Sequence, residues 1–121
     1  MHGHILVWLD QKSARLFRID RNSADTGSGP NQIVHCDQLS HAEHSDNKAF
    51  FSQIAGGLTD ATGILIVGPG EERSAFSTWL TERCPDIASN IWAVEPIDHP
   101  TDPQLIAHGR TYFTAEEKMR A

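Results

Sequence analysis

Two short segments of the chain carry apolar residues on both of their alternating faces. In Ile5–Asp10, Leu6 and Trp8 alternate with three aliphatic side chains, and Gly63–Val67 is apolar throughout. A strand that is apolar on both sides must be covered on both sides, and such strands lie in the middle of a sheet. The hydrophobic pattern therefore predicts two central strands.

The rest of the chain predicts three more strands and three helices. Ser45 and the capping box Thr101–Gln104 mark the starts of two helices. Pro85 is expected to stop a helix, and Pro96 places the last strand at a sheet edge. The further strands are Ser13–Ile19, Gln32–Cys36 and Ile91–Ile97, the helices are 45–58, 71–84 and a final one from Thr101, and the loops are 22–31 and 37–45.

This order predicts one α/β domain over residues 1–121 with the ribonuclease-H-like arrangement β-β-β-α-β-α-β-α. Three antiparallel strands and two right-handed crossovers give a mixed five-stranded sheet of order 3-2-1-4-5, with helices on both faces. Strands 1, 4 and 5 then run parallel, and ligand crevices form where the carboxyl ends of such strands meet. The residues expected at this crevice are Asp10, Gly68, Pro69, Gly70, Asp98, His99, Thr101 and Asp102.

The net charge of the chain argues against nucleic acid as the main partner. The formal net charge is −6, whereas domains that bind nucleic acid usually need a basic excess to neutralise phosphates. DNA is therefore not an expected partner, and any RNA contact should be weak and local. The densest basic patch lies in one hairpin, where strand alternation places Lys12 and Arg18 on one face and Arg15 and Arg21 on the other.

Several features favour a cytoplasmic location. The apolar runs are too short to cross a bilayer, so no membrane partner is expected. Met1–His4 shows no basic start and no cleavage site for a signal peptide. Cys36 and Cys84 are too few for a disulfide framework and suit a reducing compartment.

A metal-dependent enzyme that cleaves phosphodiesters is one alternative, built on Asp10, Asp98 and Asp102. A two-metal site needs three or four carboxylates. The strand that ends at Val67 supplies none, and the first helix supplies at best Asp46. The same three aspartates serve equally well as turn and cap residues without a metal. No catalytic residue is therefore predicted.

Metal and phosphate motifs are incomplete as well. Only His41 and His44 form a plausible pair of zinc ligands, and a structural zinc site typically uses two pairs. The glycine turn at 68–70 precedes a helix and resembles a phosphate cradle, but Glu71 and Glu72 already supply negative charge there. The sequence predicts neither a metal nor a cofactor.

Three stretches of the chain resemble a bacterial family named translational machinery protein. The stretches are Val7–Asp10 with Ala14–Phe17, then Ile64–Gly70, and then Asp98–Asp102 followed by Gln104–Leu105 and Tyr112–Phe113. This family is related to the ribonuclease-H-like middle domain of archaeal and eukaryotic peptide-chain release factors. The resemblance implies a ribosome or a translation factor as partner, with a role in release, rescue or stalling.

The resemblance does not imply hydrolysis of peptidyl-tRNA. Release factors with that activity carry Gly-Gly-Gln before the first helix, and Gln38–His44 lacks it, while Gly56-Gly57 is followed by Leu58. The leading hypothesis is a non-catalytic, translation-associated interaction module. The alternatives are the metal-dependent enzyme and a protein-binding domain that pairs through a sheet edge, without a tie to translation. The sequence indicates no oligomeric state.

Overall fold

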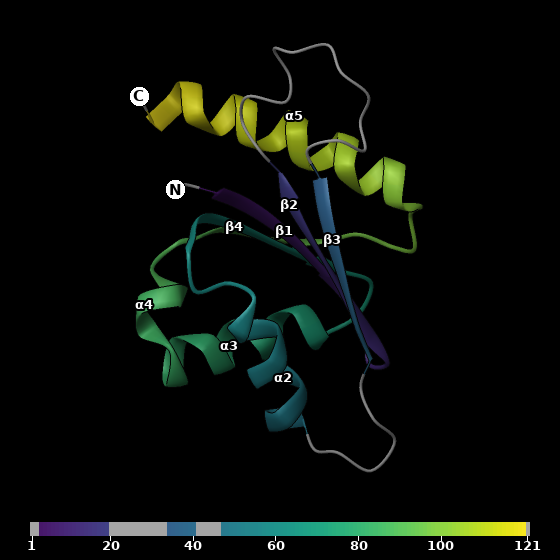
Figure 1. Ribbon diagram of the computed structural model, residues 1–121, viewed down its shortest axis with the longest axis vertical. Helices are drawn as coiled ribbons and strands as arrows, with labels where there is room; N and C mark the ends of the chain where they lie inside the picture. The colour runs from purple at the N-terminus through teal and green to yellow at the C-terminus, as the bar shows by residue number, and fades with distance from the viewer. Residues whose placement is uncertain (1–2, 20–33, 41–46, 121) are drawn as a thin grey trace.

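A computed structural model describes the backbone at residues 3–19, 34–40 and 47–120 and the side chains at 3–19 and 48–119. In these ranges the predicted strands and helices follow one another in the predicted order, with one additional short helix before the last strand (Figure 1). The strands are β1 (Gly3–Leu9), β2 (Ser13–Ile19), β3 (Val34–Ser40), β4 (Ala61–Gly68) and β5 (Ile91–Pro96). The helices are α2 (Asn47–Gly56), α3 (Glu72–Arg83), α4 (Pro85–Ala88) and α5 (Asp102–Arg120).

All five strands form one mixed sheet. They lie in the order β3-β2-β1-β4-β5, as the crossovers predict. β2 pairs antiparallel with β1 and β3, whereas β1, β4 and β5 run parallel. β5 is an edge strand, which agrees with the position of Pro96 near its end. The carboxyl ends of β1, β4 and β5 therefore lie on the same side of the sheet.

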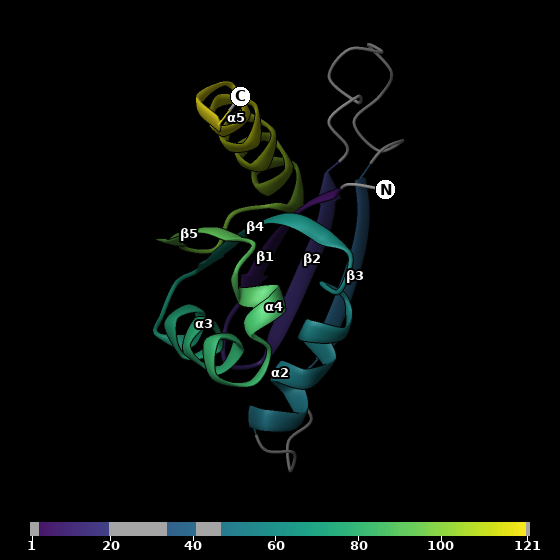
Figure 2. The same cartoon turned by 90° about the vertical axis from the view of Figure 1, so that its left-hand side faces the viewer.

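Helices cover the two faces of the sheet unequally. α5 lies alone on one face, and α2, α3 and α4 lie on the other (Figure 2). Alternate side chains of β1 enter two separate cores. Ile5, Val7 and Leu9 pack with α2 and α3, while Leu6 and Trp8 pack with α5. Because burial of one large apolar side chain contributes roughly 1.5–3 kcal/mol, this strand anchors both layers.

The observed ends of β3 and α2 correct the predicted ones. β3 begins at Val34 and runs to Ser40, so the segment 37–40 is strand and not loop. It keeps extended pairing with β2 as far as Ser13↔Ser40, and this backbone ladder does not depend on apolar side chains. α2 ends at Gly56, the first residue of the pair Gly56-Gly57, because glycine loses more conformational freedom in a helix than other residues do. The expected cap Ser45 lies outside the described residues.

Pro85 does not simply stop a helix. α3 ends at Arg83, and Pro85 begins the four-residue helix α4. Proline suits the first position of a helix because its fixed φ is helical and its missing N–H would have no partner there. This short helix was not predicted from the sequence.

The capping box at the start of α5 is confirmed. The Thr101 backbone N–H donates to Gln104 Oε1 at 2.9 Å, and the Gln104 N–H donates to Thr101 Oγ1 at 3.3 Å. Each side chain thus satisfies a backbone donor that the first turn leaves unpaired. Within the described part of the chain, no helix is long and apolar enough to cross a membrane.

Gly68, the last residue of β4, passes very close to β1. A Cβ atom at this position would lie 2.3 Å from the Leu9 carbonyl oxygen, and that backbone cannot move without disturbing both strands. We therefore expect Gly68→Ala to lower the free energy of unfolding by about 1–3 kcal/mol, as overpacked core sites do. Urea denaturation measures it. Gly70→Ala is the control, because no atom lies within 4 Å of its added Cβ. Equal midpoints for the two variants would contradict the prediction.

Candidate functional site

A pocket of about 400 Å³ opens at the carboxyl ends of the parallel strands. Three connections form its walls: the β1–β2 turn, the β4–α3 turn and the β5–α5 segment. The lining residues are Asp10, Gln11, Lys12, Pro69, Gly70, Glu71, Glu72 and His99. This is the edge at which the parallel strands predict a crevice.

Asp10 shapes the first wall. Its Oδ1 accepts backbone hydrogen bonds from Lys12 at 2.8 Å and from Ser13 at 2.9 Å, and its own N–H donates to the Ser13 carbonyl at 3.0 Å. Asp10 is thus a turn residue. Its other oxygen, Oδ2, lies 4.0 Å from His99 Nε2, beyond hydrogen-bond distance. One oxygen holds the turn while the second faces the pocket wall formed by His99.

The second wall is the Gly68–Gly70 turn and the start of α3. The Arg73 guanidinium folds back and donates to the Gly68 carbonyl at 3.3 Å and to the Gly70 carbonyl. Glu71 and Glu72 precede it at the positive end of the helix, where negative charge is favourable. Arg73 therefore stabilises the turn through its carbonyl groups and does not line the pocket.

Trp8 holds the third wall. The Trp8 indole Nε1–H donates to the Asp98 carbonyl at 2.9 Å, and the edge of the His99 ring meets the indole at 5.5 Å between centroids. His99 Nδ1 lies 3.1 Å from Asp98 Oδ1. The Ile97 N–H donates to the Gly68 carbonyl at 3.0 Å, which joins this segment to the second wall.

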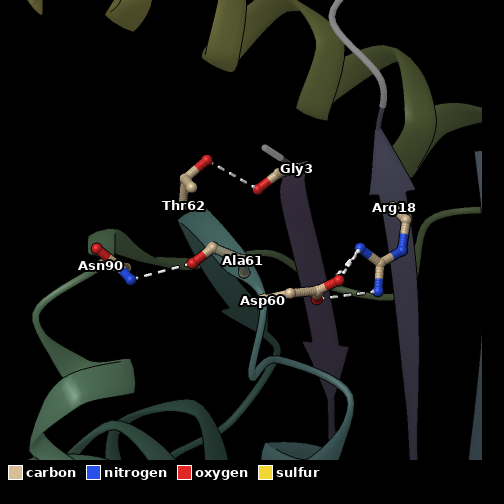
Figure 3. Close-up of polar contacts among 6 residues, drawn as sticks. All are labelled: Gly3, Arg18, Asp60, Ala61, Thr62 and Asn90. Carbon is tan, nitrogen blue, oxygen red and sulfur yellow. Dashed lines mark hydrogen bonds and ion pairs between the residues drawn. The ribbon is translucent and has the colours of Figure 1, made fainter. Parts of the chain in front are cut away.

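The two arginines of β2 are separated by the sheet. Arg15 forms an ion pair with Asp102, and its guanidinium lies 4.6 Å from the centre of the Trp8 ring. Arg18 pairs with Asp60 at 3.3 Å, before the amino end of β4 and away from the pocket (Figure 3). The opposite orientations agree with strand alternation, and each cation already has a carboxylate partner.

Further bonds fasten the same amino end of the sheet that Arg18 and Asp60 join. Thr62 Oγ1 donates to the Gly3 carbonyl at 3.2 Å, and Asn90 Nδ2 donates to the Ala61 carbonyl at 3.0 Å (Figure 3). They connect β1, β4 and the residue before β5. Polar side chains at this end therefore serve cohesion, in contrast with those that line the pocket.

Only part of the predicted crevice lines the pocket. Asp10, Pro69, Gly70 and His99 do so. The other four do not line it. The carbonyls of Gly68 and Asp98 accept bonds that hold two of its walls, whereas Thr101 caps α5 and Asp102 pairs with Arg15. Lys12, predicted as an RNA contact, lines the pocket. Gln11, Glu71 and Glu72 were missed, although Gln11 and Glu71 each neighbour a predicted residue in sequence.

Several predicted residues cannot be placed. Arg21, His41, His44 and Asp46 lie outside the described residues, and so does the side chain of Cys36. Among the side chains that are described, no group of three or more His, Cys, Asp or Glu is arranged to hold a metal ion.

No protein-family model matches this chain, and no curated protein matches it. Solved structures do match. Pelota from Archaeoglobus fulgidus gives a TM-score of 0.71 at 16% identity over 98% of this chain. An archaeal translation termination factor, aRF1, gives 0.57 at 9% identity over 98%, and Dom34 from S. cerevisiae gives 0.51 at 8% over 97%. The chain shares its fold with part of these proteins. It spans 35%, 40% and 38% of their respective lengths.

The hydrogen bond from the Trp8 indole to the Asp98 carbonyl should hold the β5–α5 segment, the third wall of the pocket, in place. We expect Trp8→Phe to keep the fold but to lose about 1–3 kcal/mol, because the phenyl ring lacks the donor and fills less space. Amide hydrogen exchange at Asp98 and His99 should become about tenfold faster. Trp79→Phe, on the opposite face of the sheet, is the control and should leave exchange at these two amides unchanged. Unchanged exchange in Trp8→Phe would show that this bond does not hold the wall.

Proposed function

We propose that this chain is a non-catalytic, translation-associated interaction module that docks on a ribosome-linked partner through the pocket at the carboxyl ends of β1 and β4. The likeness to Pelota along 98% of the chain is the observation that supports it most. aRF1 is a translation termination factor, and Dom34 is a termination-like factor of RNA quality control pathways that interacts with Hbs1. The finer assignments, a ribonuclease-H-like domain of a bacterial cytoplasmic protein, belong to the same proposal.

The position of the pocket supports a docking role. In sheets with parallel strands, ligands bind outside the carboxyl ends, in the crevice where neighbouring connections diverge. Here the three surrounding connections are each fixed by hydrogen bonds, through Asp10, Arg73 and Trp8. A wall that is already rigid loses little conformational entropy when a partner binds. The pocket is therefore suited to recognition.

The three aspartates of the enzyme alternative make separate contacts within the fold. Asp10 Oδ1 accepts two backbone hydrogen bonds, Asp102 is paired with Arg15, and Asp98 lies against His99. Three of the predicted crevice residues thus act as a turn residue, an ion-pair partner and a loop contact. Among the described side chains, no three of these carboxylates are arranged to hold a metal ion. These contacts favour the non-catalytic function.

Co-sedimentation with ribosomes in sucrose gradients tests the proposed docking. Gly70 lines the pocket and has open space beside it, so we expect Gly70→Trp to fold, to fill the pocket and to abolish co-sedimentation. Gly56→Trp is the matched control, since Gly56 also has open space but lies in α2. If wild type does not sediment with ribosomes at low salt, direct ribosome docking is wrong. Equal sedimentation of both variants would leave docking in place and exclude the pocket.

A capture experiment with and without ribonuclease separates the classes of partner. RNA-dependent capture would support the predicted contact through the basic hairpin, at residues Lys12, Arg15, Arg18 and Arg21. Two to four phosphate contacts give a slope of roughly −2 to −4 when the logarithm of affinity is plotted against that of salt concentration. Capture of proteins that have no link to translation would instead support the alternative of an unrelated protein-binding domain.

The absence of nuclease activity is a separate prediction. Purified protein with magnesium or manganese should leave single-stranded, duplex and hybrid RNA intact, because the candidate carboxylates serve the turn and the Arg15 ion pair. Gel analysis of labelled substrates provides the measurement. Cleavage that is present in wild type and lost in Asp10→Asn would overturn the prediction, since asparagine keeps the Oδ1 acceptor of the turn.

A further inference from the structure

The pocket has more negative than positive charge. Asp10, Glu71 and Glu72 line it, and Lys12 is the cation among its lining residues. His99, counted as neutral, adds no charge. The excess of carboxylates is not compensated by the next residue of α3, because Arg73 is turned toward the carbonyls of the glycine turn.

Two carboxylates outside the pocket are neutralised by arginines of β2. Asp102 is paired with Arg15 and Asp60 with Arg18. In the part of the chain that the structure describes, Glu71 and Glu72 take part in no ion pair or side-chain hydrogen bond. Asp102 and Asp60 are each paired with an arginine, whereas Glu71 and Glu72 line the pocket without a described partner. A cation from a partner could pair with these two carboxylates in the same way.

Asp10 presents an oriented acceptor toward this pocket. The two backbone hydrogen bonds to Oδ1 fix the carboxylate, and Oδ2 is 4.0 Å from the nearest described ion-pair partner, His99 Nε2. Asp10 is only a quarter exposed, so a cation that reaches it is partly withdrawn from water. Charge-assisted hydrogen bonds gain strength in such surroundings. Phosphate would meet repulsion from the same oxygens.

We propose that the pocket receives the side chain of an arginine or lysine from a basic segment of a partner protein. This rests on the proposed function, because it specifies the chemistry of the surface by which the module docks. A volume of about 400 Å³ is within the range of pockets that enclose small ligands. The guanidinium group has donors enough to contact the Asp10 and Glu72 carboxylates together. RNA is the competing occupant. Lys12→Gln separates the two, because it should strengthen binding of a cationic peptide and weaken binding of RNA.

The test is an NMR titration of the isotope-labelled chain with two capped peptides of glycine and serine, one with a central arginine and the other with alanine there. We expect the arginine peptide to shift the amides of Gln11, Lys12, Gly70 and His99, and the alanine peptide to shift none of them. A short RNA oligonucleotide forms a third arm. Stronger shifts of these amides by RNA than by the arginine peptide would overturn the proposal.

Two double variants separate the pocket from general attraction to an acidic protein. Asp10→Asn with Glu72→Gln should weaken binding of the arginine peptide about tenfold. The control is Glu82→Gln with Asp86→Asn, at exposed residues of α3 and α4 outside the pocket. This control also removes two negative charges from the net charge of −6, and it should change the affinity for the arginine peptide by less than about twofold. Equal weakening in the two variants would mean that the net charge alone attracts the peptide.

Lys12→Gln gives a result that damage to the fold cannot imitate. Removal of the cation from the pocket should strengthen binding of the arginine peptide by roughly two- to fivefold, whereas it would weaken binding of RNA. Weaker binding of the peptide would overturn the proposal. If the peptide binds as expected but the chain does not sediment with ribosomes, the pocket chemistry stands and the proposed function fails. Sedimentation without peptide binding gives the reverse conclusion.

Discussion

β1 is hydrogen-bonded along both edges and covered on both faces, and every other part of the molecule is arranged around it. Its side chains alternate between two cores, so neither α5 nor the α2–α4 layer could be removed without exposing large apolar groups to water. Its antiparallel neighbour, β2, forces a tight turn at Asp10, while its parallel neighbour, β4, brings a second carboxyl end beside that turn. The pocket is a consequence of this one strand having neighbours of opposite direction.

Trp8 shows how the same strand connects the core with the pocket. Its indole is buried in the α5 core, yet its ring nitrogen reaches the carbonyl of Asp98, 90 residues further along the chain. Arg15 then lies over the ring and binds Asp102, which continues the contact into the first turn of α5. A buried aromatic residue with one polar atom is suited to this arrangement, since the ring supplies packing and the nitrogen supplies direction.

The pattern of apolar residues was sufficient for the strands, the sheet order and the general position of the crevice. It succeeded because Leu6 and Trp8 occupy a face that must be buried if the strand is central. It failed for β3, whose extent depends on pairing with β2 and not on its own apolar residues. The partners of Arg15 and Arg18 are 87 and 42 residues away in sequence, so no local pattern could have shown that both cations are paired. Glu71 and Glu72 oppose a phosphate site, and the same two charges give the pocket its excess of carboxylates.

Stability and recognition make different demands on charged residues, and this chain separates them by position. The ion pairs of Arg15 and Arg18 join segments that are distant in sequence. The Arg15 side chain is only 20% exposed, so removal of Asp102 would leave a largely buried charge without compensation, whereas the Arg18–Asp60 pair is exposed and contributes little. Glu71 and Glu72 are adjacent carboxylates whose mutual repulsion is offset in part by the helix dipole. Such residues add little to cohesion, and in the described structure neither forms an ion pair or a side-chain hydrogen bond, so both remain available to a partner. A pocket with rigid walls and unpaired carboxylates therefore suits binding of an external cation better than it suits holding the fold together.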